Sequence, residues 1–190
     1  AARMMKIKHP KDVFFVMVSY LPVPSKVGEM KTKPTQSAVR TLNASGIQPD
    51  IIMARAETHL DAKRKEKLSM FCNVPSDRII SAPDVESIYD VPLNFEKEKL
   101  GDLLCSIMGT TCSRKETPQA KKWKEFVKKV HTAKDEVRIA VIGKYFETGD
   151  FVLSDSYLSV IEALKYSSYS QNKKPVMSWL NAVDYEKNPE

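Results

Sequence analysis

The stretch GEMKTKPTQS, residues 28–37, concentrates side chains that can bind an anion. Lys31 and Lys33 bring two ammonium groups to a predicted helix start, where free backbone N–H groups and the helix dipole already favour negative charge. Neutral hydrogen-bonding side chains accompany them: Thr32, Thr35 and Gln36. Phosphate is the ligand that suits this chemistry, and the alternative is a solvated basic loop before a helix that starts at Pro34. The stretch is not a Walker A loop, because it lacks the G-x-x-x-x-G-K-[ST] pattern.

Other polar positions carry weaker signals. Lys67 lies in a charged run that begins at Lys63, and a charge run on a helix is usually a solvated face. Asp84 follows a short apolar run, so it suits a ribose hydroxyl or a magnesium-bound phosphate, or it caps the next turn. The histidines lack metal-ligand spacing: His9, His59 and His131. No nucleophile elbow or Cys–His arrangement is visible, so we assign no catalytic residue and no metal ligand.

Alternating strands and helices must position these residues. Apolar runs and helical periodicity predict, in order, strand 13–20, helix 34–46, strand 51–55, helix 60–71, strand 77–81 and helix 95–108. Thr32 is a candidate cap of the first helix, and Gly46 suits its end. The alternation predicts an α/β fold, a Rossmann-like parallel sheet with helices on both faces. The polar loops then open on one edge of the sheet, where ligands bind in such folds.

A second α/β unit is predicted after a basic connector. Residues 109–136 form the connector, in which Trp123, Phe126, Val127 and Val130 make one apolar helical face. A strand pattern restarts at Val137, and a helical stripe and a further strand, PVMSWL, follow. The roughly fifty residues from 137 to 190 are too few for a doubly wound domain, so we expect the chain to be part of a longer protein.

The net charge of +6 and an isoelectric point near 9.1 raise a polyanion as a partner. Residues 113–136 alone contain eight Lys or Arg against four acidic residues, so the excess lies mainly in the connector. No base-reading motif or aromatic platform accompanies this charge. We therefore expect no nucleic-acid partner.

Cysteine use and hydropathy indicate a cytoplasmic protein with reduced thiols. The cysteines are odd in number and show no CxxC pairing: Cys72, Cys105 and Cys112. This argues against a disulfide framework and against a zinc site. The apolar run Val13 to Val18 is too short to cross a bilayer, and the first ten residues lack the apolar core of a signal peptide. We expect no membrane association.

Three stretches together resemble the CTP synthase family: GEMKTKPTQSAVRTLNASGIQPDIIMAR, LSMFCNVPSDRIISAPDVESIYDVP and VRIAVIGKYFETGDFVLSDSYLSVIEALK. Family members join an N-terminal amidoligase domain of P-loop type to a C-terminal class I glutaminase domain. The resemblance implies that residues 1–108 are the C-terminal part of the amidoligase domain and that residues 109–136 are the linker. Residues 137–190 would then be the first βα unit of a truncated glutaminase domain.

The resemblance implies part of an enzyme of pyrimidine nucleotide biosynthesis that makes CTP from UTP. In the family, ATP phosphorylates the uracil 4-oxygen, and ammonia released from glutamine displaces that phosphate. By motif, the UTP- and CTP-binding residues are Lys31, Thr32, Lys33, Pro34, Thr35, Gln36 and Lys67. By motif, the ATP-binding residues are Arg55, Pro83, Asp84 and Val85. The resemblance also implies Mg²⁺ with ATP, no tightly bound cofactor, CTP as feedback inhibitor, GTP as activator and a homotetramer.

Several family elements have no counterpart in these residues, namely the glycine-rich P-loop, the magnesium-binding carboxylates and the glutaminase Cys-His-Glu triad. We therefore expect the chain to contain no catalytic residue and to be inactive alone. The insert Thr148 to Asp155 is longer than in many members, and no role is assigned to it. The alternative function is a non-catalytic nucleotide-binding or assembly module of the same family. A P-loop upstream and a G-x-C-x-G elbow downstream in the reading frame would favour the enzyme.

Overall fold

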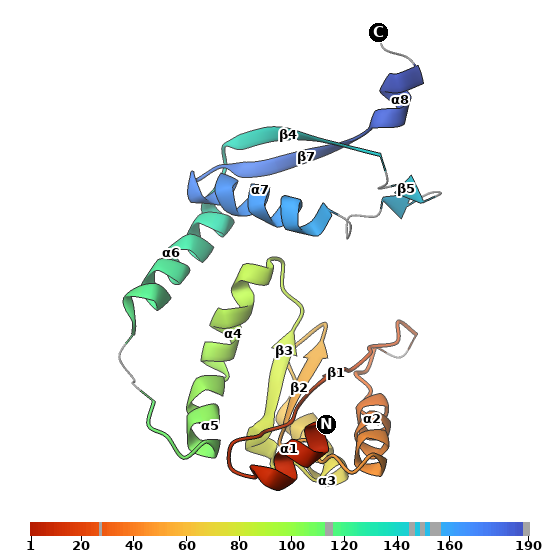
Figure 1. Ribbon diagram of the computed structural model, residues 1–190, viewed down its shortest axis with the longest axis vertical. Coiled ribbons are helices and arrows are strands. Elements are labelled where there is room, and N and C mark those ends of the chain that lie inside the picture. The colour runs from red at the N-terminus through yellow and green to blue at the C-terminus, as the bar shows by residue number, and fades with distance from the viewer. Residues whose placement is uncertain (27, 113–115, 145–146, 149–150, 153–156, 188–190) are drawn as a thin grey trace. The chain divides into compact units, whose positions relative to one another are not determined.

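The computed structural model describes residues 1–26, 28–112, 116–144, 147–148, 151–152 and 157–187 (Figure 1). It divides into two compact units, Ala1–Lys115 and Glu116–Glu190, which we call the first and the second unit and describe separately. Among the described residues, no helix is long and apolar enough to cross a membrane.

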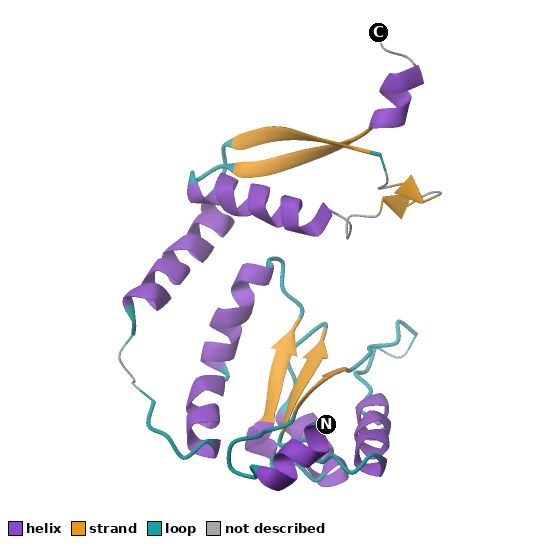
Figure 2. Ribbon diagram, in the orientation of Figure 1, coloured by secondary structure: helices purple, strands orange, loops and turns teal. Residues whose placement is uncertain are grey.

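The first unit is built on a parallel sheet of β1 (Val16–Tyr20), β2 (Ile51–Ala56) and β3 (Ile79–Pro83), in that order (Figure 2). The crossovers run through α2 (Lys33–Ala44) and α3 (Ala62–Cys72), which confirms the predicted α/β fold with parallel strands. The register pairs Tyr20 with Arg55 and Ala56 with Pro83, so the three strands end at the same edge. Each candidate polar loop follows one of these carboxyl ends.

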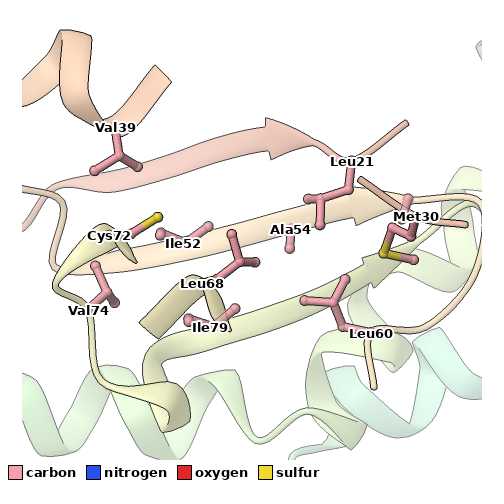
Figure 3. Packing of buried hydrophobic residues seen from close by; sticks show 11 residues of the cluster. Leu21, Met30, Val39, Ile52, Ala54, Leu60, Leu68, Cys72, Val74 and Ile79 are labelled. Carbon is pink, nitrogen blue, oxygen red and sulfur yellow. The ribbon is translucent and has the colours of Figure 1, made fainter. Parts of the chain in front are cut away.

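One face of this sheet packs against α2 and α3. The buried cluster there includes Val39 of α2, Leu68 of α3 and Ile52 and Ala54 of β2 (Figure 3). Because side chains alternate along a strand, Met53 points to the opposite face of β2. On that opposite face, α4 (Val91–Lys97) contacts β3, so helices lie on both sides of the sheet, as predicted.

The helix ends differ in part from the sequence prediction. Gly46 follows the end of α2 with φ +76°, a left-handed conformation that favours glycine, as predicted. Thr32 precedes α2 but makes no side-chain capping bond, because its own backbone is helical (φ −91°, ψ −15°) rather than extended. The side chain of Asp61 caps α3 by accepting a hydrogen bond from the backbone N–H of Arg64 at 2.7 Å. This cap was not predicted from the sequence.

The helix predicted at residues 95–108 is two helices, α4 and α5 (Leu100–Ile107). The break falls at Lys99, which has φ +57°. There the carboxylate of Glu98 turns inward and accepts bonds from Lys65 Nζ at 2.8 Å and the Ser81 backbone N–H at 3.2 Å. Burial opposes ionisation of Glu98, but these bonds outweigh it and hold the pKa below the usual range. Lys65 is thus paired and half-buried, so its prediction as part of a solvated run is wrong.

The face of β1 that is turned away from α2 and α3 is exposed. Val16, Val18 and Tyr20 are 46%, 61% and 48% exposed. Among the described strands, β1 pairs only with β2, so it is an edge strand of this sheet.

Cys105 and Cys112 are joined by a disulfide, with Cα atoms 5.8 Å apart, so the prediction that all three thiols are reduced is wrong. The odd cysteine count was misleading because Cys72 is buried in the core of the first unit and stays free. Helix α5 ends beyond Cys105, and the Thr110 N–H donates to the Cys105 carbonyl at 3.0 Å, which bends the chain back. The short spacing of the two cysteines therefore brings them together.

This pairing predicts the thiol count. We expect the unfolded, unreduced chain to react with one equivalent of a chromogenic thiol reagent, through Cys72, and the reduced chain with three. In the folded chain Cys72 should react slowly, because it is only 1% exposed and burial raises its pKa. The Cys112→Ser variant should show two thiols without reduction. Three reactive thiols in the unreduced, unfolded wild-type chain would contradict the disulfide.

The second unit pairs β4 (Glu136–Gly143) with β7 (Lys174–Asn181) in parallel, and α7 (Leu158–Ser170) forms the crossover. The connector helix, α6 (Pro118–Thr132), packs on α7, where the Phe126 and Tyr166 ring centroids are 4.7 Å apart. Short elements not predicted from the sequence complete the structure: α1 (Ala2–Lys8), two 3-10 turns at Ser76–Arg78 and Ile88–Asp90, β5 (Glu147–Thr148), β6 (Phe151–Val152) and α8 (Ala182–Lys187). Most of the insert Thr148 to Asp155 lies outside the described residues.

Candidate functional site: two cavities at the carboxyl edge of the sheet

The loop after β1 is fixed at its base and exposed at its tip. Gly28 begins the tip with φ +63° and an N–H bond to the Pro24 carbonyl at 2.9 Å. The side chain of Met30 is buried in the core, and the Lys31 N–H donates to the Pro22 carbonyl at 2.9 Å. Because Met30 points inward, the side chains on either side of it, Glu29 and Lys31, lie at the surface of the loop.

This loop and α3 enclose a strongly cationic cavity of about 460 Å³. Its lining contains five cationic side chains: Lys31, Lys33, Lys63, Arg64 and Lys67. Glu29 is the carboxylate in the same lining. The structure thus brings Lys67 of α3 to the loop lysines, which local sequence reasoning alone did not indicate. An excess of cations around a hollow of this size favours a polyanionic ligand.

A network of ion pairs joins the loop to α3 across the cavity. Glu29 accepts a hydrogen bond from Lys31 Nζ at 2.9 Å, and its other oxygen lies 3.6 Å from the Arg64 guanidinium. Arg64 also pairs with Asp61 and donates from Nε to the Met30 carbonyl at 3.4 Å. The hydrogen bond from Lys31, and then the positive charges of Lys31, Arg64 and Lys67, hold the pKa of Glu29 below its usual range.

The other predicted members of the loop motif lie beside the cavity or beneath it. Thr32 lines the cavity, but its hydroxyl accepts a hydrogen bond from Gln36 Nε2 at 3.1 Å and is almost fully buried. The Thr35 hydroxyl is fully buried and bonds to the Ser19 hydroxyl at 2.8 Å. Pro34 is exposed in the first turn of α2. Thr35 and Gln36 therefore direct their polar groups into the fold, where they fix the loop to β1 and α2.

A second cavity, of about 610 Å³, lies on the opposite face of the sheet. All four residues of the predicted ATP set line it: Arg55, Pro83, Asp84 and Val85. Apolar side chains from several elements complete much of the wall: Val18, Met53, Ile88, Val91 and Phe95. A mostly apolar cavity that contains a few polar groups is the usual form of a small-molecule site.

Arg55 and Asp84 form an ion pair at this second cavity, with the guanidinium 2.7 Å from Asp84 Oδ1. Both side chains are about half exposed, so the pair contributes little to stability and is open to exchange with a ligand. The alternative that Asp84 caps the next turn is wrong, because the hydroxyl of Ser87 accepts the bond from the Tyr89 N–H that caps that turn.

Comparison with known proteins identifies the family. Residues 1–110 match the family model described as CTP synthase N-terminus. The chain belongs to the CTP synthase family.

Curated proteins named CTP synthase match nearly the whole chain. Those of Thermococcus gammatolerans and Thermococcus kodakarensis are each 44% identical over 188 residues, which is 98% of this chain and 34% of each relative. The protein of Pyrobaculum aerophilum is 38% identical over 190 residues, which is all of this chain and 34% of the relative. The chain therefore spans about a third of the length of these curated CTP synthase relatives.

Sequence reasoning missed three charged residues of the first cavity, Glu29, Lys63 and Arg64. Glu29 stands inside the motif GEMKTKPTQ but attracted no role, because a carboxylate does not itself suggest an anion site. Lys63 and Arg64 were placed with Lys65 in a solvated run. Lys63 is exposed, as that predicts, although it lines the cavity, whereas Arg64 is half-buried and ion-paired, so the prediction is wrong for Arg64. The signal that separates them is helical spacing: Lys63, Arg64 and Lys67 fall at i, i+1 and i+4, on one side of α3.

Proposed function

We propose that this chain is the part of a CTP synthase that supplies one wall of its pyrimidine nucleotide site and one wall of its ATP site. A single observation carries the proposal: four of the residues predicted for UTP (Lys31, Thr32, Lys33 and Lys67) and all four predicted for ATP line two different cavities at the same edge of one parallel sheet. A reaction between two nucleotides needs two such sites that open near each other.

The cationic cavity takes the triphosphate of UTP. Lys31, Lys33 and Lys67 supply the ammonium groups, and Thr32 lies in the same wall. Pro34, Thr35 and Gln36 belong to the site as the first turn of α2, which carries the loop and holds it to β1. CTP has the same triphosphate, so the same cavity serves the product when it acts as feedback inhibitor.

The second cavity takes ATP. Its apolar wall packs against the adenine ring, and the backbone and side chains of Pro83 and Val85 lie along it. Asp84 accepts a hydrogen bond from a ribose hydroxyl, for which its second carboxylate oxygen has room, and Arg55 stays paired with the first oxygen. The ion pair thus orients the carboxylate for the sugar.

The proposed reaction transfers the γ-phosphoryl group of ATP to the uracil 4-oxygen and releases ADP. Ammonia then attacks carbon 4, the phosphate leaves, and one proton is lost, which gives CTP. This chain binds and orients the nucleotides, and the groups that act on the phosphoryl transfer and on glutamine belong to other parts of the protein. Among the described residues no group of three or more His, Cys, Asp or Glu is placed to hold a metal ion, so we route no step through Mg²⁺.

The remaining family properties complete the proposal. Residues 1–108 belong to the amidoligase domain, 109–136 to the linker and 137–190 to the start of the glutaminase domain. The whole enzyme is a cytoplasmic homotetramer that takes ammonia from glutamine, is activated by GTP and uses no tightly bound cofactor.

The function is tested by assaying CTP formation by the full-length protein that contains this chain, supplied with UTP, ATP, Mg²⁺ and glutamine. We expect CTP to form, as measured by chromatography. The Asp84→Asn variant should raise the KM for ATP by about tenfold or more and change the KM for UTP by less than about twofold, because one charge-assisted hydrogen bond is lost from one cavity only.

Asp77→Asn is the matched control, because Asp77 is an exposed carboxylate near β3 that lines neither cavity. It should leave both KM values unchanged. Equal effects of Asp84→Asn on the two substrates would contradict the assignment of separate cavities. Binding of UTP and ATP without formation of CTP would instead favour the non-catalytic nucleotide-binding module.

A further inference from the structure

The carboxylate of Glu29 lies among the cations of the first cavity. One of its oxygens is 2.9 Å from Lys31 Nζ, and the other is 3.6 Å from the Arg64 guanidinium. It therefore bridges two cations that come from different elements, the loop and α3. These neighbours lower its pKa, so Glu29 is ionised at neutral pH.

Among the ion pairs that join the loop to α3, those made by Glu29 are the ones that a ligand can replace. Its side chain is 59% exposed and makes ion pairs only to residues of the cavity lining, among the contacts that the structure gives it. Arg64, in contrast, has two partners besides Glu29, the carboxylate of Asp61 and the Met30 carbonyl, and its side chain is only 25% exposed. If Glu29 moved away, Arg64 would stay in place and face the cavity.

A carboxylate and a phosphate bind the same kinds of cationic side chain. Both present oxygens that accept bonds from ammonium and guanidinium groups, and a guanidinium can bind two oxygens of either at once. Exposed ion pairs are worth little, so a phosphate with two or more negative charges can displace a single carboxylate from Lys31 and Arg64. The cost of that displacement is subtracted from the affinity for the ligand.

We propose that Glu29 is an internal counter-ion of the nucleotide site, which holds Lys31 and Arg64 in the absence of ligand and is displaced when a triphosphate binds. Arg64 is then a further phosphate-binding residue, in addition to the lysines. The identification of the triphosphate as that of a pyrimidine nucleotide rests on the proposed function. Glu29 thereby lowers the affinity for nucleotides in proportion to the charge that they place in the cavity.

The test measures binding of UTP and uridine to the full-length protein by calorimetry. Glu29→Gln should tighten UTP binding by about threefold to tenfold, because the competing charge is removed while the side chain keeps its size. Binding of uridine, which has no phosphate, should not change. Unchanged or weaker UTP binding by Glu29→Gln would overturn the inference, since a carboxylate that only orients Lys31 would weaken binding when neutralised.

Two controls are needed for the effect of Glu29→Gln on UTP binding. One tests whether any loss of negative charge near the site has the same effect, and the other tests whether Arg64 itself binds the phosphate. Glu66→Gln removes an exposed carboxylate from α3, next to Lys67 in the sequence but outside the cavity lining, and should leave UTP binding unchanged. In the double variant Glu29→Gln plus Arg64→Ala, the gain from Glu29→Gln should shrink, because one of the two released cations is missing. An equal gain with and without Arg64 would remove Arg64 from the proposal.

Inorganic tripolyphosphate is the probe that distinguishes failure of this inference from failure of the proposed function. If Glu29→Gln tightens tripolyphosphate binding while UTP binds no better than tripolyphosphate, the counter-ion role stands and the pyrimidine nucleotide assignment fails. If the wild-type protein binds UTP and makes CTP, but Glu29→Gln changes neither ligand's affinity, the proposed function stands and the counter-ion role fails.

Discussion

Replacing Lys31 and Lys33 together by alanine is expected to raise the KM for UTP of the full-length protein by one to several orders of magnitude. Both ammonium groups line the cationic cavity, and each charge-assisted hydrogen bond to a phosphate that is lost costs roughly 1.5–3 kcal/mol. Inhibition by CTP should weaken in parallel, because in the proposed site the same lysines bind its triphosphate. The KM for ATP should change little, because neither lysine lines the second cavity.

A matched control removes two lysines elsewhere. Lys122 and Lys128 are exposed on α6 in the second unit, so replacing both by alanine makes the same change in net charge without touching either cavity. This variant should keep the wild-type KM for UTP. If UTP kinetics and CTP inhibition were unaffected by the loss of Lys31 and Lys33, the loop would be an ordinary basic surface and the nucleotide assignment would fall.

Leu68→Ala is expected to lower the free energy of unfolding of the first unit by about 2.5–5 kcal/mol, which is a large part of the stability of a small domain. Leu68 is fully buried on α3 and lies in one cluster with Ile52 of β2 and Ile79 of β3 (Figure 3). Truncating it removes apolar contacts and leaves a cavity between the helix and the sheet. Urea unfolding followed by circular dichroism measures the loss.

The same helix offers a control for this prediction. Met70 lies two residues after Leu68, but it is 74% exposed. Met70→Ala should change the free energy of unfolding by less than about 0.5 kcal/mol, because little apolar surface is withdrawn from water at that position. Similar losses for the two variants would mean that the cluster around Leu68 does not hold the helix to the sheet.

The parallel sheet and the succession of strands and helices along the chain were predictable because their determinants are local. Val16 to Tyr20 and Ile51 to Ala56 are apolar runs that are bounded by loop residues, and helical segments separate them. Strands that alternate with helices leave little choice but a parallel sheet. For the same reason the amino-acid sequence alone is enough to single out the loops at its carboxyl edge as candidate binding elements.

The break between α4 and α5 was not predictable from periodicity. Leu100, Leu103, Leu104 and Ile107 fall at helical spacing, and residues 95–99 before them contain no proline or glycine, so the sequence favours one helix. The break is stabilised by a carboxylate, Glu98, that bonds to Lys65 of α3 and to the backbone of Ser81 in β3. The break therefore depends on contacts between residues that are distant in the chain, and the periodicity of a local stretch contains no information about such contacts.

Only some of the residues of the cationic cavity could be predicted from the sequence, for a related reason. Lys31 and Lys33 are conspicuous because they flank a helix start, but Arg64 belongs to the site only because its guanidinium reaches the Met30 carbonyl and Glu29 from another helix. Helical spacing places Arg64, which lines the cavity, and Lys65, which turns to Glu98, on different sides of α3, but spacing alone does not say which side faces the loop. That is decided by the tertiary packing of α3.

The exposed edge strand β1 bears on how the isolated 190-residue chain behaves in solution. Its outer backbone groups have no partner strand among the described residues, and Val16, Val18 and Tyr20 add an uncovered apolar stripe beside them. Such an edge is a template on which a second copy can add a strand. We expect self-association to begin while both copies are still folded, so that protein concentration, rather than temperature, limits how long the chain stays soluble.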